Sequence, residues 1–575
     1  MRVFQVILAL LVFQFCRAQV ADEEFGPPMK IPLLITAGFG EIRPNHFHSG
    51  LDFSTQGKSQ EVIAAFEGCV SRIKVSLSGY GRALYLDHPN GYTTVYGHLS
   101  SFNPEIETYI IQMQAQALDY EIDVLVDSGR FCFKKGDVIA MSGNSGSSTA
   151  PHLHFEIRDK VVENVFNPLF FGYGRDKAAP EAFSVLLFPE EHSGTVNGSA
   201  NMLRLPLLKS KSGKRYLSSK TPVPIASGMV AFGLEGGDVI GKPGNYSGIY
   251  QLKVFVNEAE IFRSRMDEFS FDESRAVNAY IDYKSKKRYN KKYQKCFVPQ
   301  NPLIGIYKSS ANRGFYNFNR DTLYQIRLEL SDFAGNTTSQ SFQVKGRSGS
   351  GFYKYSPPEE NYSRIPPTGG TIKKAGFKAV IGARCLYDTS DVKIIVHPQP
   401  GKYAPLVELG SIYIPLHSGI KLAFTPELKQ TELREKLCIA QKSGNSWNVL
   451  SSTWHNDELQ ASTKTFGDFT VLIDTIPPLI RQIPIKKRHP QTRKYYVLSN
   501  EEAGEIKVKI TDPVSESASW QAYLDEQFLI PQPAGKDTWV YKLPVQLNSG
   551  KHSFTIQARD EYNNESSFSL ELNIP

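Results

Sequence analysis

The sequence predicts a mainly β protein, in which an antiparallel β-sheet domain with one helical insertion precedes a series of β-sandwich modules. Short runs of alternating apolar and polar residues recur along the chain, and glycine, proline and asparagine separate them, which is typical of strands joined by tight turns. At 575 residues the chain is also too long for one hydrophobic core, because a domain usually takes about 100–200 residues. We therefore expect four domains after an N-terminal leader.

Residues 1–18 have the features of a signal peptide. A positive charge at Arg2 is followed by an apolar run over residues 3–15, and the small residue Ala18 gives a cleavage site. The apolar run is shorter than the ~20 residues that span a bilayer, so we expect no transmembrane helix once the signal is removed. Cys16 lacks the preceding small residues of a lipoprotein signal, which disfavours lipid attachment.

Residues 25–175 form the first predicted domain, which is rich in glycine and in short strands. The segments 83–87 and 92–96 flank an Asn-Gly pair that supplies the positive φ angles of a tight hairpin turn. A loop of glycine and serine at 142–149 leads into another strand. The sheet is therefore expected to be antiparallel.

A helical insertion interrupts this sheet. Residues 104–120 have helical composition and no glycine, and they begin with Pro-Glu-Ile-Glu, which is typical of a helix N-terminus. The insertion follows His98 closely. It could form a wall of a functional cleft or decorate the surface, and the sequence favours neither interpretation.

The first motif of this domain carries two candidate metal ligands. On a strand, side chains alternate between the two faces, so His48, Gly50 and Asp52 would share one face. Ser49 and Leu51 would then face the core. Glycine between the two ligands is expected to leave room for an ion.

A second motif repeats this spacing. His152, His154 and Glu156 would lie on the open face of a strand, with Leu153 and Phe155 directed inward. The sequence leaves two roles open for Glu156: it could orient a metal ligand from behind, or it could be an ordinary exposed glutamate.

These residue types suit zinc hydrolysis. Catalytic zinc usually takes three protein ligands from His, Asp or Glu and keeps one position for water, whose pKa falls to about 7. His48, Asp52 and one histidine of the His152/His154 pair would supply such a set. The other histidine and His98 could hold or deprotonate the water and stabilise an oxyanion.

Three ordered runs of the sequence, residues 43–53, 96–100 and 143–156, resemble the M23 family of zinc metallopeptidases, the relatives of LytM and lysostaphin. The resemblance covers about residues 25–175. Ala150 stands where the family often has glycine, and the helical insertion is longer than in the minimal family domain, so the shape of the cleft cannot be transferred.

The resemblance implies a role for each candidate residue. His48, Asp52 and His154 would bind one zinc ion, and His98 and His152 would be the catalytic pair. It also implies that the substrates are peptides of bacterial cell-wall peptidoglycan. Many relatives have lost ligands and only activate other hydrolases, whereas this chain has kept them all.

The sequence after residue 175 predicts three further β domains, at residues 176–346, 347–475 and 476–575. It shows no cluster of histidines or acids. The first and the last of these domains share a turn pattern, at 332–336 and at 560–564, that predicts the end of an immunoglobulin-like β-sandwich. The prolines that follow Asp474 predict a linker, because successive prolines cannot continue a sheet.

Cysteine usage and charge narrow the class of protein. Five of the six cysteines follow the leader, an odd number without a C-x-x-C pair, so neither a disulfide framework nor a thiolate zinc site is expected. We expect most of them to be buried as small hydrophobic residues. One disulfide is an alternative if the protein lies in an oxidising compartment. The net charge of +7 is modest and favours an anionic envelope polymer over nucleic acid.

The sequence thus predicts a secreted, zinc-dependent endopeptidase of peptidoglycan, in the periplasm or at the outer membrane or cell surface of a Gram-negative bacterium. Its C-terminal modules would contact an anionic envelope polymer or an envelope protein, and nucleic acid is not an expected partner. Two alternatives remain open. The chain could be a non-catalytic M23-like regulator or wall-binding scaffold that activates another hydrolase, or a metallopeptidase that acts on proteins.

Overall fold

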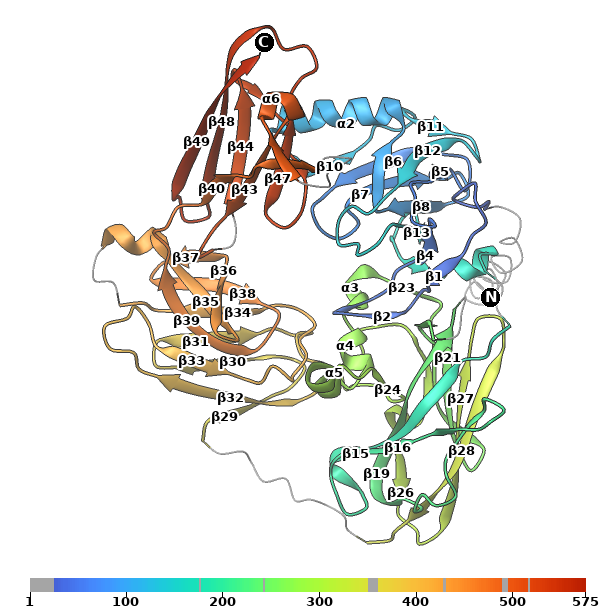
Figure 1. Ribbon diagram of the computed structural model, residues 1–575. Coiled ribbons are helices and arrows are strands. Elements are labelled where there is room, and N and C mark those ends of the chain that lie inside the picture. Colours follow the sequence, from blue (N-terminus) through green and yellow to red (C-terminus); the bar gives the residue numbers. More distant parts are fainter. Residues whose placement is uncertain are drawn as a thin grey trace, which may run out of the picture.

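The computed structural model describes residues 25–174, 177–240, 244–349, 360–427, 431–488, 495–515 and 518–574. The predicted signal peptide at residues 1–18 lies outside these ranges. Strands dominate the described chain and helices are few, which confirms the mainly β fold. The sheets form four groups in chain order, and the last group returns to the first, so that the molecule has the outline of a ring (Figure 1).

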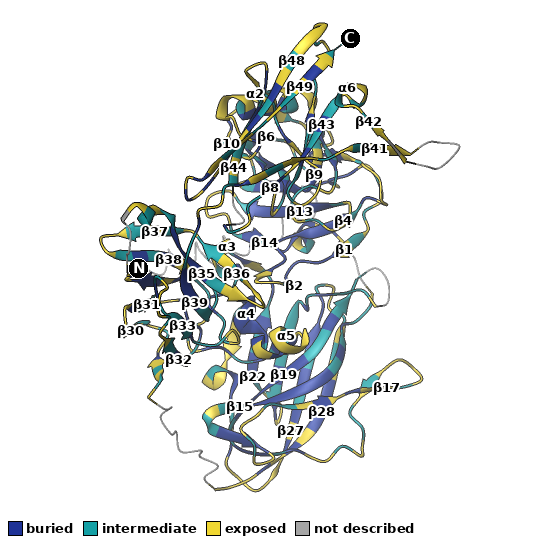
Figure 2. Cartoon of the chain, turned by 60° about the vertical axis from the view of Figure 1, so that its left-hand side comes forward, coloured by how far each residue is buried: buried dark blue, intermediate teal, exposed yellow. Residues whose placement is uncertain are grey.

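The N-terminal domain is built on a twisted antiparallel sheet, and the expected antiparallel arrangement is confirmed. The main strand order is β1 (Ile35–Ala37), β4 (Leu51–Ser54), β13 (His152–Asp159), β8 (Tyr92–Gly97), β7 (Arg82–Asp87), β6 (Gly68–Val75) and β10 (Ile122–Leu125). Smaller sheets are formed by β5 (Glu61–Ile63), β12 (Val138–Ser142) and β9 (Leu99–Phe102), and by β2 (Ile42–Arg43) and β3 (His46–Phe47). Figure 2 shows β4 and β13 buried within this domain.

The predicted helical insertion is confirmed as α2 (Pro104–Ala117). Its first turn is capped by Asn103, whose side chain accepts a hydrogen bond from the Glu105 amide, and Pro104 fits there because the first helical N–H needs no partner. The helix ends at Leu118 in the left-handed conformation.

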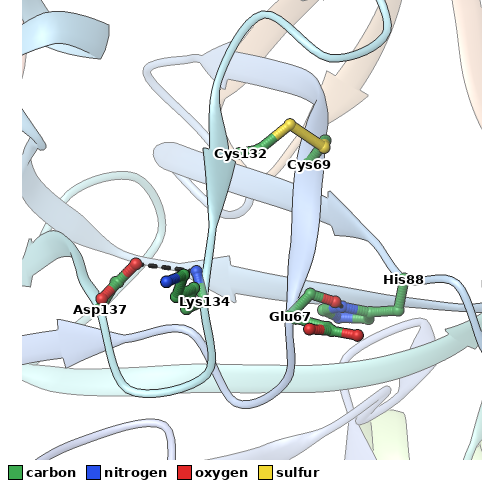
Figure 3. Close-up of a disulfide and its surroundings, with 6 residues drawn as sticks. All are labelled: Glu67, Cys69, His88, Cys132, Lys134 and Asp137. Atoms are coloured by element: carbon green, nitrogen blue, oxygen red, sulfur yellow. Dashed lines mark hydrogen bonds between the residues drawn. A yellow bond between two sulfur atoms is a disulfide. The ribbon is translucent and has the colours of Figure 1, made fainter.

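One disulfide, between Cys69 of β6 and Cys132 of β11 (Cys132–Phe133), closes a long segment of the N-terminal domain (Figure 3). The segment includes both His98 and α2. The sequence analysis allowed for one disulfide without assigning its two cysteines. The other cysteines of the described chain are free and buried, as expected.

The second domain shares its core with the N-terminal domain. Its large sheet follows the order β16 (Leu203–Pro206), β15 (Glu181–Val196), β19 (Ile225–Val239), β28 (Thr337–Gly346), β27 (Leu323–Ser331), β21 (Gln251–Val256), β22 (Ala259–Arg265) and β25 (Tyr307–Ser310). Phe47 and Val165 of the N-terminal domain belong to the same hydrophobic cluster. In addition, β14 (Val165–Phe166) pairs with β23 (Glu268–Phe269), so one sheet crosses the predicted boundary.

The third domain consists of two antiparallel sheets around one core. The first follows the order β29 (Tyr362–Ile365), β32 (Ser390–His397), β33 (Leu406–Leu409), β39 (Gly467–Ile473), β35 (Leu437–Ser443) and β36 (Ser446–Leu450). The second follows the order β30 (Gly370–Lys374), β31 (Phe377–Ile381), β34 (Ile420–Phe424), β38 (Glu458–Thr463) and β37 (Ser452–His455).

The C-terminal domain also has two main sheets around one core. The first follows the order β40 (Leu479–Gln482), β43 (Glu505–Thr511), β47 (Thr538–Lys542) and β46 (Gln532–Pro533). The second follows the order β45 (Gln527–Phe528), β44 (Ala518–Leu524), β48 (Gly550–Asp560) and β49 (Glu565–Ile574). Trp539 of this domain lies 6.4 Å from Tyr120, ring centre to ring centre, and Ile530 packs against the N-terminal core. These contacts close the ring. The domain boundaries drawn from the sequence stay predictions.

Within the described residues, no helix combines the length and the apolar character needed to cross a membrane.

Candidate metal centre

Two neighbouring strands bring the two sequence motifs together. β4 and β13 pair antiparallel, with Asp52 opposite His154. The residues between the ligands, Leu51 and Leu153, are fully buried in the core, as the alternation of a strand requires. His48 precedes β4 and reaches the same point from a loop.

Three ligand atoms meet there. The Nε2 atom of His48 lies 3.0 Å from Oδ1 of Asp52 and 3.1 Å from Nδ1 of His154, and Nδ1 of His154 lies 2.9 Å from the same Asp52 oxygen. All three side chains are buried. The structure therefore assembles the predicted set of His48, Asp52 and His154.

The hydrogen bonds of the two histidines suit a bound cation. Nδ1 of His48 is 2.8 Å from the Gly38 carbonyl oxygen and must donate to it, while Nε2 of His154 is 2.8 Å from Oε1 of Glu156. Each ring thus donates from one nitrogen away from the cluster and directs its other nitrogen at Asp52. Two imidazole nitrogens and a carboxylate that converge in a buried place are a usual donor set for a metal ion, so the residues fit a metal.

Glu156 is not an exposed glutamate but lies behind His154, as the first of its two predicted roles requires. The side chain is fully buried and accepts hydrogen bonds from His154, Tyr80 and Arg158. Burial alone would raise the pKa of Glu156, but Arg158 and His154 outweigh it and hold that pKa well below its ordinary value. Glu156 is therefore a carboxylate that fixes the His154 ring. In the second domain, Phe271 lies under Arg158, with the guanidinium 4.3 Å from the ring centre.

Two predictions about the first motif are wrong. Ser49 does not face the core but donates to Glu156, because β4 begins only at Leu51 and the strand alternation does not extend back to it. Gly50 is not there to leave room for an ion. A Cβ at this position would lie 2.2 Å from the Phe155 carbonyl oxygen, so glycine allows β13 to approach closely.

His98 and His152 form a second pair beside the ligands. Their ring centres are 4.6 Å apart, and Nε2 of His152 lies 3.5 Å from Oδ1 of Asp52. Nδ1 of His98 is 2.8 Å from the Ser145 carbonyl oxygen, and Nδ1 of His152 is 2.8 Å from the Ala150 carbonyl oxygen. Each ring therefore keeps its Nε2 atom for other partners. Burial and the neighbouring His154 and His152 lower the pKa of His98 to about 4, so its ring is neutral at pH 7.

All five predicted residues thus lie together, and the structure adds partners that the sequence analysis missed. Tyr80 stacks on His154 at 5.0 Å between ring centres, and Arg43 donates to the second carboxylate oxygen of Asp52 at 3.1 Å. Arg158 carried a usable signal, because it lies two residues beyond Glu156 on the same face of β13. Tyr80 carried none, since it comes from a distant loop.

A cavity of about 1240 Å³ lies between the N-terminal and C-terminal domains, and its lining includes Ser145, whose carbonyl oxygen contacts His98. Ser100 and Ser145 line it on the side of the site, and Glu107 and Tyr120 line it from the helical insertion. The insertion is therefore a wall of this cavity, which none of the five site residues lines, and its role as a wall of the functional cleft stays a prediction. The C-terminal domain supplies further lining residues, among them Trp520, Lys536, Trp539 and Lys542.

Comparisons with known proteins match two parts of this chain. Residues 46–115 match Peptidase family M23, and residues 368–474 match the Zu5-like domain. The predicted family resemblance is confirmed, and the N-terminal domain of this chain is a peptidase M23 domain.

Two relatives and one solved structure illustrate the likeness. An uncharacterized metalloprotease of Haemophilus influenzae is 37% identical over 130 residues, which cover 23% of this chain and 21% of that protein. DD-carboxypeptidase/endopeptidase Mpg of Neisseria meningitidis serogroup B is 32% identical over 111 residues, covering 19% of this chain and 20% of that protein. The catalytic domain of the antimicrobial peptidase lysostaphin from Staphylococcus simulans is 25% identical, covers 24% of this chain and 91% of that domain, and has a TM-score of 0.19. The match thus spans about a fifth of the length of these curated relatives.

Proposed function

We propose that this chain is an exported, zinc-dependent endopeptidase that hydrolyses peptide bonds in bacterial peptidoglycan. The observation that carries the proposal is the convergence of His48, Asp52 and His154, with a ring nitrogen of each histidine directed at the same Asp52 oxygen, next to the pair His98 and His152. Peptidase relatives that include a DD-carboxypeptidase/endopeptidase support the same class of substrate.

The ligand set favours zinc over calcium or magnesium. Two imidazole nitrogens and one carboxylate are a usual donor set for catalytic zinc, whereas calcium and magnesium prefer oxygen ligands alone. A zinc ion held there would supply the Lewis acidity that makes water a nucleophile at neutral pH.

The remaining residues have distinct tasks in this proposal. The Nε2 atoms of His98 and His152 accept a proton from the water or donate a hydrogen bond to the carbonyl oxygen of the scissile peptide. Glu156 and the Gly38 carbonyl hold the ligand rings in the productive orientation. The neighbouring cavity is larger than the ~300–1,000 Å³ of a usual small-molecule site and has room for a peptide segment.

Export is supported by the disulfide between Cys69 and Cys132, because such bonds persist in oxidising compartments. We place the enzyme in the periplasm or at the surface of a Gram-negative bacterium. The second, third and C-terminal domains would hold it against an anionic envelope polymer or an envelope protein. The lysine-rich helix α5 (Tyr283–Tyr289) is a candidate contact for such a polymer.

The test is digestion of purified peptidoglycan, followed by mass spectrometry of the released muropeptides and measurement of the metal content of the protein. Wild type should contain one zinc ion and release peptides. His152→Ala should keep the zinc and lose about 10²–10⁴-fold in rate, as expected for a general acid or base. His455→Ala, at an exposed histidine of the third domain, is the matched control and should be fully active.

Two outcomes would contradict the proposal. If zinc is absent and wild type is as inert as His152→Ala, the chain is a regulator or scaffold for another hydrolase. If glycine-rich proteins are cleaved and no muropeptide is released, it is a peptidase that acts on proteins.

A further inference from the structure

Three aspartates that are far apart in the sequence meet where the third and C-terminal domains join. Asp474 follows β39 at the end of the third domain, Asp512 follows β43, and Asp560 ends β48. Each offers a carboxylate oxygen, and these three oxygens all lie within 4.8 Å of one another. Asp474 is completely buried and Asp560 nearly so.

Backbone amides and one asparagine hold this cluster in place. The Asp512 carboxylate accepts hydrogen bonds from two amides of the turn that follows it, at 2.7 and 2.8 Å. Asp560 accepts bonds from the Tyr562 and Asn564 amides, both at 2.8 Å. The side-chain amide of Asn564 donates to Asp560 at 2.7 Å and to the Asp474 carbonyl oxygen at 3.1 Å, so it ties the two domains together.

Two carboxylate oxygens of the cluster have no partner. Oδ2 of Asp474 and Oδ2 of Asp512 are both buried and accept no hydrogen bond. Burial, together with the negative charges of Asp512 and Asp560, raises the pKa of Asp474 to about 6. A buried, unpaired carboxylate oxygen is costly, because it loses its hydration without compensation. These two oxygens are therefore available to bind a cation.

No basic side chain of the described part of the molecule pairs with these carboxylates. The ammonium group of Lys436 acts on Asp474 only through its charge, because it donates to two neutral oxygens, the Tyr562 carbonyl at 2.8 Å and the Asn564 side chain at 2.6 Å. None of the three aspartates forms an ion pair with a described lysine, arginine or histidine.

The related turn in the second domain shows that hydrogen bonding alone does not gather acids in this way. Asp332 accepts bonds from the Asn336 amide at 2.8 Å and from its side chain at 2.6 Å, as Asp560 does from Asn564. Among the described residues, however, Asp332 belongs to no group of three carboxylates or other metal-binding side chains. The packing of the third domain against the C-terminal domain, and not the turn itself, therefore brings Asp474, Asp512 and Asp560 together.

We infer that Asp474, Asp512 and Asp560 bind a calcium ion that joins the third domain to the C-terminal domain. Donors that are oxygen atoms alone select hard cations. Calcium fits better than magnesium because it accepts six to eight oxygens in an adaptable arrangement, whereas magnesium demands a regular octahedron that three separate loops do not readily supply. This inference does not depend on the proposed peptidase activity.

Calcium at the junction would fix the angle at which the C-terminal domain leaves the third domain. Since the C-terminal domain also lines the cavity shared with the N-terminal domain, the ion would hold Trp520 and Trp539 at that cavity. Extracellular modules bind calcium with Kd values of about 10⁻⁴–10⁻³ M, and we expect an affinity in this range.

Calorimetric titration of the full chain tests the inference. The protein is stripped with EDTA, reloaded with one equivalent of zinc to fill the first site, and titrated with calcium chloride. Wild type should bind one calcium ion per chain, with magnesium chloride giving a weaker or no response. Asp474→Asn and Asp512→Asn each remove a negative ligand and should weaken binding at least about tenfold, because even partners outside the ligand shell cost about 10–100-fold.

Asp457→Asn, at an exposed aspartate of the third domain, is the matched control and should titrate like wild type. The isosteric Asn variants should keep the circular dichroism spectrum and zinc content of wild type, which separates loss of the site from loss of the fold. No heat of binding in wild type at calcium concentrations up to about 10 mM, ten times the weakest expected Kd, would overturn the inference. Unchanged affinity in both variants would also overturn it.

Discussion

Two clusters of metal-binding side chains in the described part of this chain are built in opposite ways. His48, Asp52 and His154 come from one domain, and two of the three lie opposite each other on paired strands. Asp474 and Asp512 come from two domains and lie on the segments that follow strands. The first cluster therefore owes its geometry to a sheet and the second to the packing of two domains.

This difference indicates which site has its ligands oriented before an ion binds. Each histidine of the N-terminal cluster is oriented by its own hydrogen bond, to Gly38 or to Glu156, so the ligands stay in place without an ion. The junction cluster keeps two unpaired oxygens, on Asp474 and Asp512, so it should gain order when an ion arrives. The predictions below separate these two behaviours, beginning with the largest effect.

Removal of a ligand should affect only the site to which it belongs. His154→Ala leaves Asp52 and His48 without their third partner, and zinc affinity should fall by more than about 100-fold, beyond the range seen for outer partners of a ligand. Hydrolysis of peptidoglycan should be lost with it. Calcium affinity, measured by titration, should equal that of wild type. A parallel loss of calcium binding would show that the two clusters are not independent.

Loss of the disulfide should weaken the N-terminal domain without altering either cluster. Cys69→Ser with Cys132→Ser should lower the free energy of unfolding by about 2–4 kcal/mol, because the open loop gains freedom in the unfolded chain. Zinc affinity should stay constant, since β6 lies three strands from β13 in the sheet. Denaturant unfolding and zinc titration measure the two quantities, and wild type under reducing conditions should behave like the double variant.

Glu156→Gln tests how far the N-terminal site depends on the partner of a ligand. The change keeps the shape of the side chain and removes the negative charge that holds His154, so zinc affinity should fall about 10–100-fold. The exposed Glu67→Gln is the control and should bind zinc like wild type. If Glu156→Gln binds zinc normally, the sheet alone positions the ligand and the hydrogen bond to Glu156 is dispensable.

Calcium should give the smallest effect, confined to the junction. At a calcium concentration ten times Kd, binding to the folded state alone adds about 1.4 kcal/mol to its stability. The transition of the third and C-terminal domains should shift upward in differential scanning calorimetry, while that of the N-terminal domain should not. An equal shift in Asp512→Asn would assign the effect to another site.

The sequence was informative where function follows local geometry. His152 and His154 lie on β13, where the alternation of a strand predicts a shared face, and His48 lies only four residues from Asp52, although it reaches the cluster from a loop. The same rule failed at Ser49, because the strand had not yet begun there. The close approach that requires Gly50 was also hidden, since it depends on where β13 runs.

Features made by contacts between distant segments could not be predicted. The aspartate cluster was not anticipated, because its members belong to separate turns that only domain packing unites. The pairing of Cys69 with Cys132 was likewise open, since the spacing of an odd set of cysteines does not specify partners. Tyr80 reaches His154 from another loop, and no local pattern marks it.

The closed ring has a consequence for the order in which the chain becomes competent. The ribosome completes the N-terminal domain first, but Trp520 and Trp539 of the last domain line a cavity that Glu107 of α2 also lines. A nascent or clipped chain that lacks the last domain would therefore have this cavity open on one side. The cavity takes its final shape only after the last domain has been made and has packed against the first.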